Sequence, residues 1–211
     1  MGKFNQGILG GFSGKVGTVI GAFWKGRNVM RALPRFHHDA NTPEQQKQRN
    51  KFSIVDKLIS AMSPLLAIGY KQFAVDETAQ NVFMRDTLAN GFGSSGAIDY
   101  DRIRFAKGAF TNVLSPSATV GTSHTLNLTW TDNTGAGIGV TGSDPVLVMA
   151  FNPTKNEMVY DVETNIREDE SATLTHPSGW AGDTVHVYIA TKELKGPVCS
   201  NAVKAATVTA A

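Results

Sequence analysis

The clearest pattern in the chain is an alternation of apolar and polar positions in its second half. Leu126, Leu128 and Trp130 alternate with polar residues, and Val185 begins a second run of the same kind. A period of two is typical of a strand with one buried face, so we expect both runs to be half-buried strands. Further strands are predicted at 102–108, 145–151, 156–162, 171–175 and 198–208. About seven short strands with turns between them favour an antiparallel β-sandwich.

A helical period precedes these strands. Apolar residues recur three or four positions apart from Phe52 to Leu65, and Thr42 with Pro43 is a typical helix start. Because Ser63 can cap and Pro64 cannot donate a backbone hydrogen bond, we expect the helix to break or kink near 63–64. A second helix is predicted over 77–89, ending at Asn90-Gly91.

The first 36 residues contain a glycine every few positions, which disfavours a helix because each glycine costs about 1 kcal/mol relative to alanine. Residues 16–23 and 28–33 are rich in β-branched, aromatic and other apolar side chains. We therefore predict a β-hairpin that turns near Lys25-Gly26.

Together these patterns predict an α+β protein. Its expected parts are a Gly-rich basic β-hairpin or arm (1–36), a helical segment (37–92), a linker (93–97) and the β-sandwich (98–211).

Charge divides the chain further. Residues 1–110 carry 15 basic and eight acidic side chains, whereas residues 111–211 carry five basic and ten acidic ones. Such asymmetry is found in proteins that contact nucleic acid or a membrane, and it can equally drive head-to-tail packing of identical subunits. The basic segment is interleaved with aromatic residues and is our candidate interaction surface. The candidate residues are Phe12, Lys15, Phe23, Trp24, Lys25, Arg27, Arg31, Arg35 and Arg49.

No motif predicts catalysis, so we expect no catalytic residue, cofactor, metal or small-molecule substrate. Gly14-Lys15 fails as a phosphate-binding loop because Leu9 and Val16 stand where that motif has Gly and Ser or Thr. His37-His38-Asp39 offers metal-ligand types with no second cluster, and a solvent-exposed loop is the simpler interpretation. The single cysteine, Cys199, excludes an internal disulfide, and we expect it to be a small buried side chain.

The sequence also predicts neither a signal peptide nor a membrane-spanning segment. Polar residues and glycines interrupt the apolar N-terminal stretch, so we expect cytoplasmic synthesis without a signal peptide. There is no run of 18 consecutive apolar residues, and we expect no membrane span.

Several motifs resemble a family of unknown function that is widespread in Bacteroidota and their phages and prophages. They are the Gly-rich run 7–17, Trp24-Lys25-Gly26, Arg31 with Pro34, the Gln/Arg-rich run 45–49 leading to Phe52, Trp130-Thr131-Asp132, and 151–156. Relatives have Asn-Pro-x-Thr before the helix, whereas this chain has Asn41-Thr42-Pro43, so the loop there is expected to differ in shape. The strands carrying Trp130 and Tyr188 resemble those of fibronectin type III and other immunoglobulin-like domains. The first resemblance implies no catalytic residue.

Three functions follow as hypotheses. The first is a structural protein of a phage or prophage-derived particle, a homo-oligomer or a subunit among others, docked through its N-terminal arm and helices. The second is a nucleic-acid-binding protein that uses the basic segment. The third is a bacterial surface or adhesion module, against which the missing export signal argues.

Overall fold

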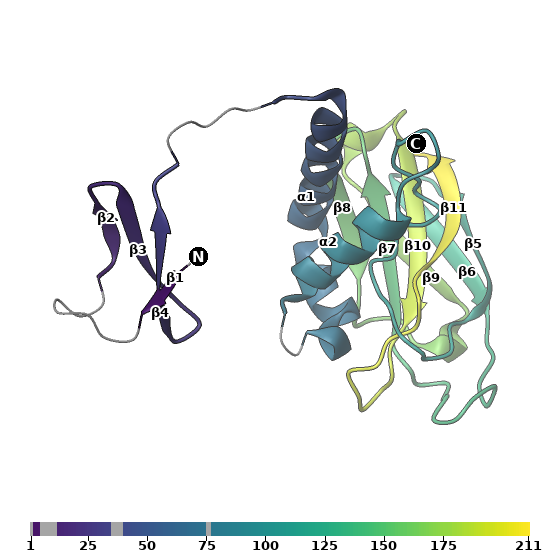
Figure 1. Cartoon of the computed structure of the whole chain (residues 1–211). Helices are drawn as coiled ribbons and strands as arrows, with labels where there is room; N and C mark the ends of the chain where they lie inside the picture. Colours follow the sequence, from purple (N-terminus) through teal and green to yellow (C-terminus); the bar gives the residue numbers. More distant parts are fainter. Residues whose placement is uncertain (1, 5–11, 35–39, 75–76) are drawn as a thin grey trace. The chain divides into compact units, whose positions relative to one another are not determined.

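The computed structural model describes residues 2–4, 12–34, 40–74 and 77–211, and the chain falls into two compact units, Met1–Thr42 and Pro43–Ala211 (Figure 1). Both units contain antiparallel sheets, and both α-helices belong to the second unit. The predicted α+β class is therefore confirmed.

The N-terminal unit is a four-stranded sheet in the order β1-β4-β3-β2. Its strands are β1 (Gly2–Phe4), β2 (Gly14–Val16), β3 (Val19–Trp24) and β4 (Arg27–Ala32). Trp24 pairs with Arg27, so Lys25 and Gly26 alone form the turn of the predicted hairpin. Both turn residues have positive φ, 45° and 76°, which suits a two-residue turn that follows the twist of its strands.

The second unit contains two antiparallel sheets, with strand orders β11-β10-β7-β8 and β5-β6-β9. The strands are β5 (Leu114–Val120), β6 (Thr125–Thr131), β7 (Val146–Asn152), β8 (Glu157–Asp161), β9 (Ser171–Thr175), β10 (Thr184–Thr191) and β11 (Val203–Thr209). Figure 1 shows both helices on one side of the four-stranded sheet and the three-stranded sheet on the other.

This layering explains why β10 departs from its predicted pattern. β6 alternates between buried and exposed residues as predicted, but β7 and nearly all of β10 are buried on both faces. One face, with Met149 and Tyr188, shares a core with the helices, while the other, with Val187, shares a core with Trp130. Trp130 and Tyr188 therefore lie in different cores, on opposite sides of the same sheet.

The first helix, α1 (Pro43–Gly69), continues through Pro64, so of the two expected outcomes at 63–64, a break or a kink, the break is wrong. Buried residues on both sides of the proline, including Met62 and Leu65, belong to one core cluster. Packing of that continuous face outweighs the roughly 3 kcal/mol that an interior proline costs. The second helix, α2 (Ala79–Asn90), begins at Thr78, whose hydroxyl accepts a hydrogen bond from the Asn81 backbone N–H.

α1 is also long and apolar enough to cross a membrane by length and composition, with a mean hydropathy of 1.4 over 18 residues. Five of its apolar side chains are buried against the rest of the second unit: Val55, Leu58, Met62, Leu65 and Leu66. A core helix passes the same test of length and composition.

The predicted linker at 93–97 lies inside the second unit. Phe92 and Ile98 form a β-bridge, and the Gly93 backbone N–H donates to the Ala97 carbonyl at 2.9 Å. Because the helices share a core with β7 and β10, this turn does not separate two compact units.

Two strand predictions also need correction. Residues 102–108 form no strand, although Ile103, Phe105 and Ala106 are buried between helices and sheet. The last strand begins only at Val203, because Cys199 and Ser200 bridge to other segments instead. The sequence pattern misses β5, whose ladder is irregular between Leu114 and Ser117.

Candidate interaction surface

The N-terminal sheet carries the residues that the sequence singles out, and its register sorts them onto two faces. Residues that pair directly across an antiparallel ladder lie on the same face. Lys15 pairs with Ile20 and Ile20 with Arg31, which sets one row across three strands. We call this side the basic face: Lys15, Ile20, Ala22, Trp24, Arg27, Val29 and Arg31.

The basic face combines cations with an exposed indole. Trp24 is 60% exposed and pairs with Arg27, and the Lys25 ammonium lies 5.4 Å from the centroid of its ring. A hollow of about 280 Å³ is lined by Ala22, Trp24, Val29 and Arg31 of this face and by Phe23, which the register places on the other side. Residues 12–34 contain no Asp or Glu. An anionic or aromatic group could therefore approach this face without meeting a like charge.

The opposite side of the sheet carries Gly14 and Asn28 but is otherwise apolar, and we call its apolar residues the apolar face: Phe12, Val16, Val19, Gly21, Phe23, Met30 and Ala32. Phe12 lies over Gly21, where an added Cβ would fall 2.6 Å from two ring carbons of Phe12. Phe23 is 70% exposed and Val16 62% exposed. A glycine at position 21 thus lets the aromatic ring sit directly on the strand.

Neither face closes over a core of its own. Among the described residues of the N-terminal unit, Val29 is the one buried hydrophobic side chain. A unit of this size rarely buries enough apolar surface to be stable alone, and exposed apolar clusters mark contact sites. The N-terminal sheet therefore presents two faces that favour contact with another surface.

The structure brings together six of the nine predicted interaction residues on the two faces, and Lys25 joins them from the adjacent turn. On the basic face lie Lys15, Trp24, Arg27 and Arg31, and on the apolar face lie Phe12 and Phe23. Arg49 lies on α1 in the second unit, and Arg35 falls outside the described residues.

Sequence reasoning missed Val16 and Met30 as parts of this surface. Both are exposed, Val16 on β2 and Met30 on β4. Their signal was available, since strand alternation places them on the same side as Phe23 once the turns at Gly17-Thr18 and Lys25-Gly26 are fixed.

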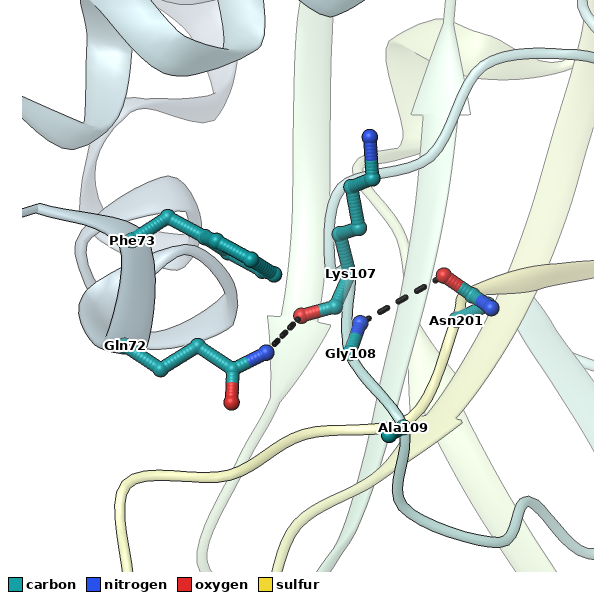
Figure 2. A pocket seen from close by; sticks show the side chains of 6 residues that line it. All are labelled: Gln72, Phe73, Lys107, Gly108, Ala109 and Asn201. Atoms are coloured by element: carbon teal, nitrogen blue, oxygen red, sulfur yellow. Dashed lines mark hydrogen bonds between the residues drawn. The ribbon is translucent and has the colours of Figure 1, made fainter.

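The second unit has a depression of about 570 Å³. Figure 2 shows the residues that line it: Gln72, Phe73, Lys107, Gly108, Ala109 and Asn201. Its polar groups are engaged in structural contacts. The Gln72 amide donates to the Lys107 carbonyl at 3.0 Å, and the Gly108 N–H donates to the Asn201 side chain at 3.4 Å. The Lys107 ammonium binds Asp86 at 2.6 Å. This depression joins three segments of the fold and offers no acid–base pair.

The remaining candidates for chemistry in the sequence are the thiol of Cys199 and the possible metal ligands. Cys199 is fully buried, and burial raises the pKa of its thiol to about 11, which suppresses the reactive thiolate. In the described part of the chain, no three His, Cys, Asp or Glu side chains gather closely enough to hold a metal ion. His37-His38-Asp39 lies outside the described residues.

The family match covers strands β2 to β4 of the N-terminal sheet and most of the second unit. Residues 11–205 match a family of unknown function, DUF6266. The chain belongs to the DUF6266 family. No curated protein and no solved structure matches it. The matched part begins just before Phe12, so both faces of the sheet from β2 to β4 belong to the DUF6266 region.

Residues 151–156, one of the motifs that resemble the family, have a structural role. The Asn152 side chain accepts hydrogen bonds from the backbone N–H groups of Thr154 and Lys155 and donates to Asp183 at 2.8 Å. Asn156 donates to the Lys57 carbonyl of α1 at 3.0 Å. The motif therefore shapes the β7–β8 turn and ties it to the helix.

Proposed function

We propose that this DUF6266 protein is a non-enzymatic structural subunit of a phage or prophage-derived particle. It joins neighbouring subunits through its N-terminal sheet and displays the second unit. The single observation that carries this proposal is the N-terminal sheet itself, which exposes Phe23 and Trp24 and encloses almost no core among its described residues. Contact with another surface would supply the missing burial.

The architecture of the second unit supports an immunoglobulin-like interpretation. Its strands divide in chain order into a sheet of the first, second and fifth strands and a sheet of the other four. Immunoglobulin constant domains divide in nearly the same way, except that their fourth strand joins the first sheet. Such sandwiches serve many functions, so the fold supports a displayed module but does not define its ligand.

The phage assignment rests on the resemblance of the Gly-rich run and the Gln/Arg-rich helix to proteins of Bacteroidota and their prophages. It is supported by the depression beside Gln72 and Lys107, whose polar groups are engaged in structural contacts. A structural subunit needs surfaces for contact and no reaction centre.

Size-exclusion chromatography with light scattering tests the proposal. We expect the full chain to form oligomers whose mass rises with concentration, and we expect Phe23→Ser/Trp24→Ser to lower that mass. Phe52→Ser is the matched control, because Phe52 is an exposed aromatic residue, 45% accessible, on α1. A full chain that stays monomeric at high concentration, and is unchanged by deletion of residues 1–36, would refute the proposal.

A second candidate function is binding of nucleic acid by the basic face. The observation that favours it is the placement of Lys15, Arg27 and Arg31 on the same side as Trp24. Cations of this kind contact phosphates and an exposed indole stacks on bases, with an affinity that falls steeply with salt. Fluorescence anisotropy with a labelled single-stranded oligonucleotide tests this function. Absence of binding at about 50 mM salt would exclude it.

A further inference from the structure

We propose that the N-terminal sheet of one chain docks on the β8 edge of a second copy of the same chain. The β8 edge is the open side of β8 (Glu157–Asp161) together with the residues that follow it to position 170. This inference rests on the proposed function and adds the identity of the partner and the surface that receives the sheet.

β8 lies at the border of the four-stranded sheet. Within the described part of the chain it pairs with β7 alone, so one row of its backbone N–H and C=O groups faces outward. Tyr160, on this strand, is 40% exposed. An open edge with an exposed aromatic residue can accept another strand.

The β8 edge is rich in acidic side chains, which the basic face lacks. Residues 157–170 contain six acidic side chains and one basic side chain, Arg167. Arg167 is fully buried and paired with the buried Asp144, so it does not offset the acids at the surface. Glu163 and Glu168 are exposed. The N-terminal sheet offers the complement, because residues 12–34 carry four cations and no acid.

The N-terminal sheet also has an open edge of its own. β2 pairs only with β3 in the described residues, and Lys15 and Val16 on β2 are exposed. Addition of β2 to β8 would pair the two open edges while opposite charges meet on either side.

This contact joins two different surfaces, so the sheet of one copy meets the β8 edge of the next. Each copy then has one donor sheet and one acceptor edge. Interfaces of this kind close into a ring or continue as a filament, depending on the rotation between neighbours. Either outcome is an assembly built from one kind of chain.

Charge reversal with rescue tests the proposal in the full chain. One variant is Lys15→Glu/Arg31→Glu, on the sheet. The other is Glu163→Lys/Glu168→Lys, two acids whose side chains make no hydrogen bond or ion pair that we observe in the described structure. Sedimentation velocity at about 50 mM and 500 mM salt measures association, since salt screens exposed charges. The control is Glu44→Lys/Glu77→Lys, which reverses two exposed acids outside the β8 edge.

We expect each reversed variant alone to associate at least about tenfold more weakly than the original chain, and the control to change little. Mixing the two variants should restore association, because the unchanged sheet of one variant can dock on the unchanged β8 edge of the other, while the introduced acids and lysines can pair at the second contact. Circular dichroism confirms that each variant is folded, and the rescue itself excludes simple unfolding as the cause of the loss.

The outcomes separate the two proposals. If the sheet variant dissociates while the β8 variant behaves like the original chain, the sheet docks elsewhere and this inference is overturned while the proposed function stands. Loss in both variants without rescue on mixing also overturns it. A chain that is monomeric at both salt concentrations overturns the inference and the proposed function together.

Discussion

Arg167 offers the sharpest test of how the second unit is held together. Its side chain is fully buried, and its Nε lies 3.5 Å from the carboxylate of Asp144, which is also buried. The guanidinium also donates to the Thr111 carbonyl at 2.9 Å and to the Asn133 side chain. One side chain thus links three separate loops to the segment between β8 and β9.

Arg167→Met would leave the Asp144 carboxylate buried without its counter-charge. Loss of one partner of a buried ion pair costs about 3–5 kcal/mol, because the remaining charge stays desolvated. Asp144 would keep its hydrogen bonds from Thr141, at 2.8 and 3.0 Å, which favours the lower part of that range. We expect the free energy of unfolding to fall by about 3 kcal/mol.

Urea unfolding followed by circular dichroism measures this change. Arg85→Met is the matched control, since Arg85 binds Glu77 at 2.6 Å but both side chains are well exposed, and such a pair contributes about 0–1 kcal/mol. The double variant Arg167→Met/Asp144→Asn should lose less than the sum of the two single variants. A loss for Arg167→Met no larger than that of the control would refute this reasoning.

Three further predictions address other parts of the second unit. Pro64→Ala should raise the free energy of unfolding by about 1–2 kcal/mol in urea, because it restores an interior donor to α1; a loss of stability would show that the proline is needed. Cys199 should react with a thiol reagent at pH 8 more than about 100-fold more slowly in the folded chain than in urea, because burial raises its pKa; equal rates would contradict its burial. Hydrogen bonds from Asn152, and to a smaller extent from Lys155, hold the pKa of Asp183 below its usual range. The ionised carboxylate therefore stabilises the fold at pH values above the pKa of the unfolded chain. This contribution disappears as the pH falls through the pKa of the folded chain. Unfolding at a series of pH values should therefore show a smaller acid-induced loss for Asp183→Asn than for the original chain, and identical slopes would contradict the assignment.

Local signals in the sequence predict the elements whose cause is local. The hairpin turn at Lys25-Gly26 and the alternation of β6 depend on neighbouring residues, and both are found in the structure. The interruption expected at Pro64 depends on a local cost that distant packing overrides, since Met62 and Leu65 are buried in one cluster with Phe151 and Tyr188. Phe151 and Tyr188 lie far from Pro64 along the chain, so the residues around the proline do not reveal this packing.

The candidate surface likewise has features that the local sequence predicts and features that depend on how the strands pair. Residue types alone identified the aromatic and basic residues of the N-terminal segment, but they could not sort Trp24 and Phe23 onto opposite faces. That sorting needs the register, which two short turns set. The acidic β8 edge cannot be predicted from the sequence for a related reason, because three consecutive acids at 168–170 are typical of a solvated turn, and only the strand order places β8 at the border of the sheet.

The burial of β7 and β10 on both faces determines how this protein can be divided. A fragment that begins at residue 98, where the strand pattern starts, would expose Leu147, Met149, Phe151 and Tyr188 to water. Such a fragment would be expected to aggregate. The second unit, which begins at Pro43, contains both cores, so experiments on the separated unit should retain the two helices.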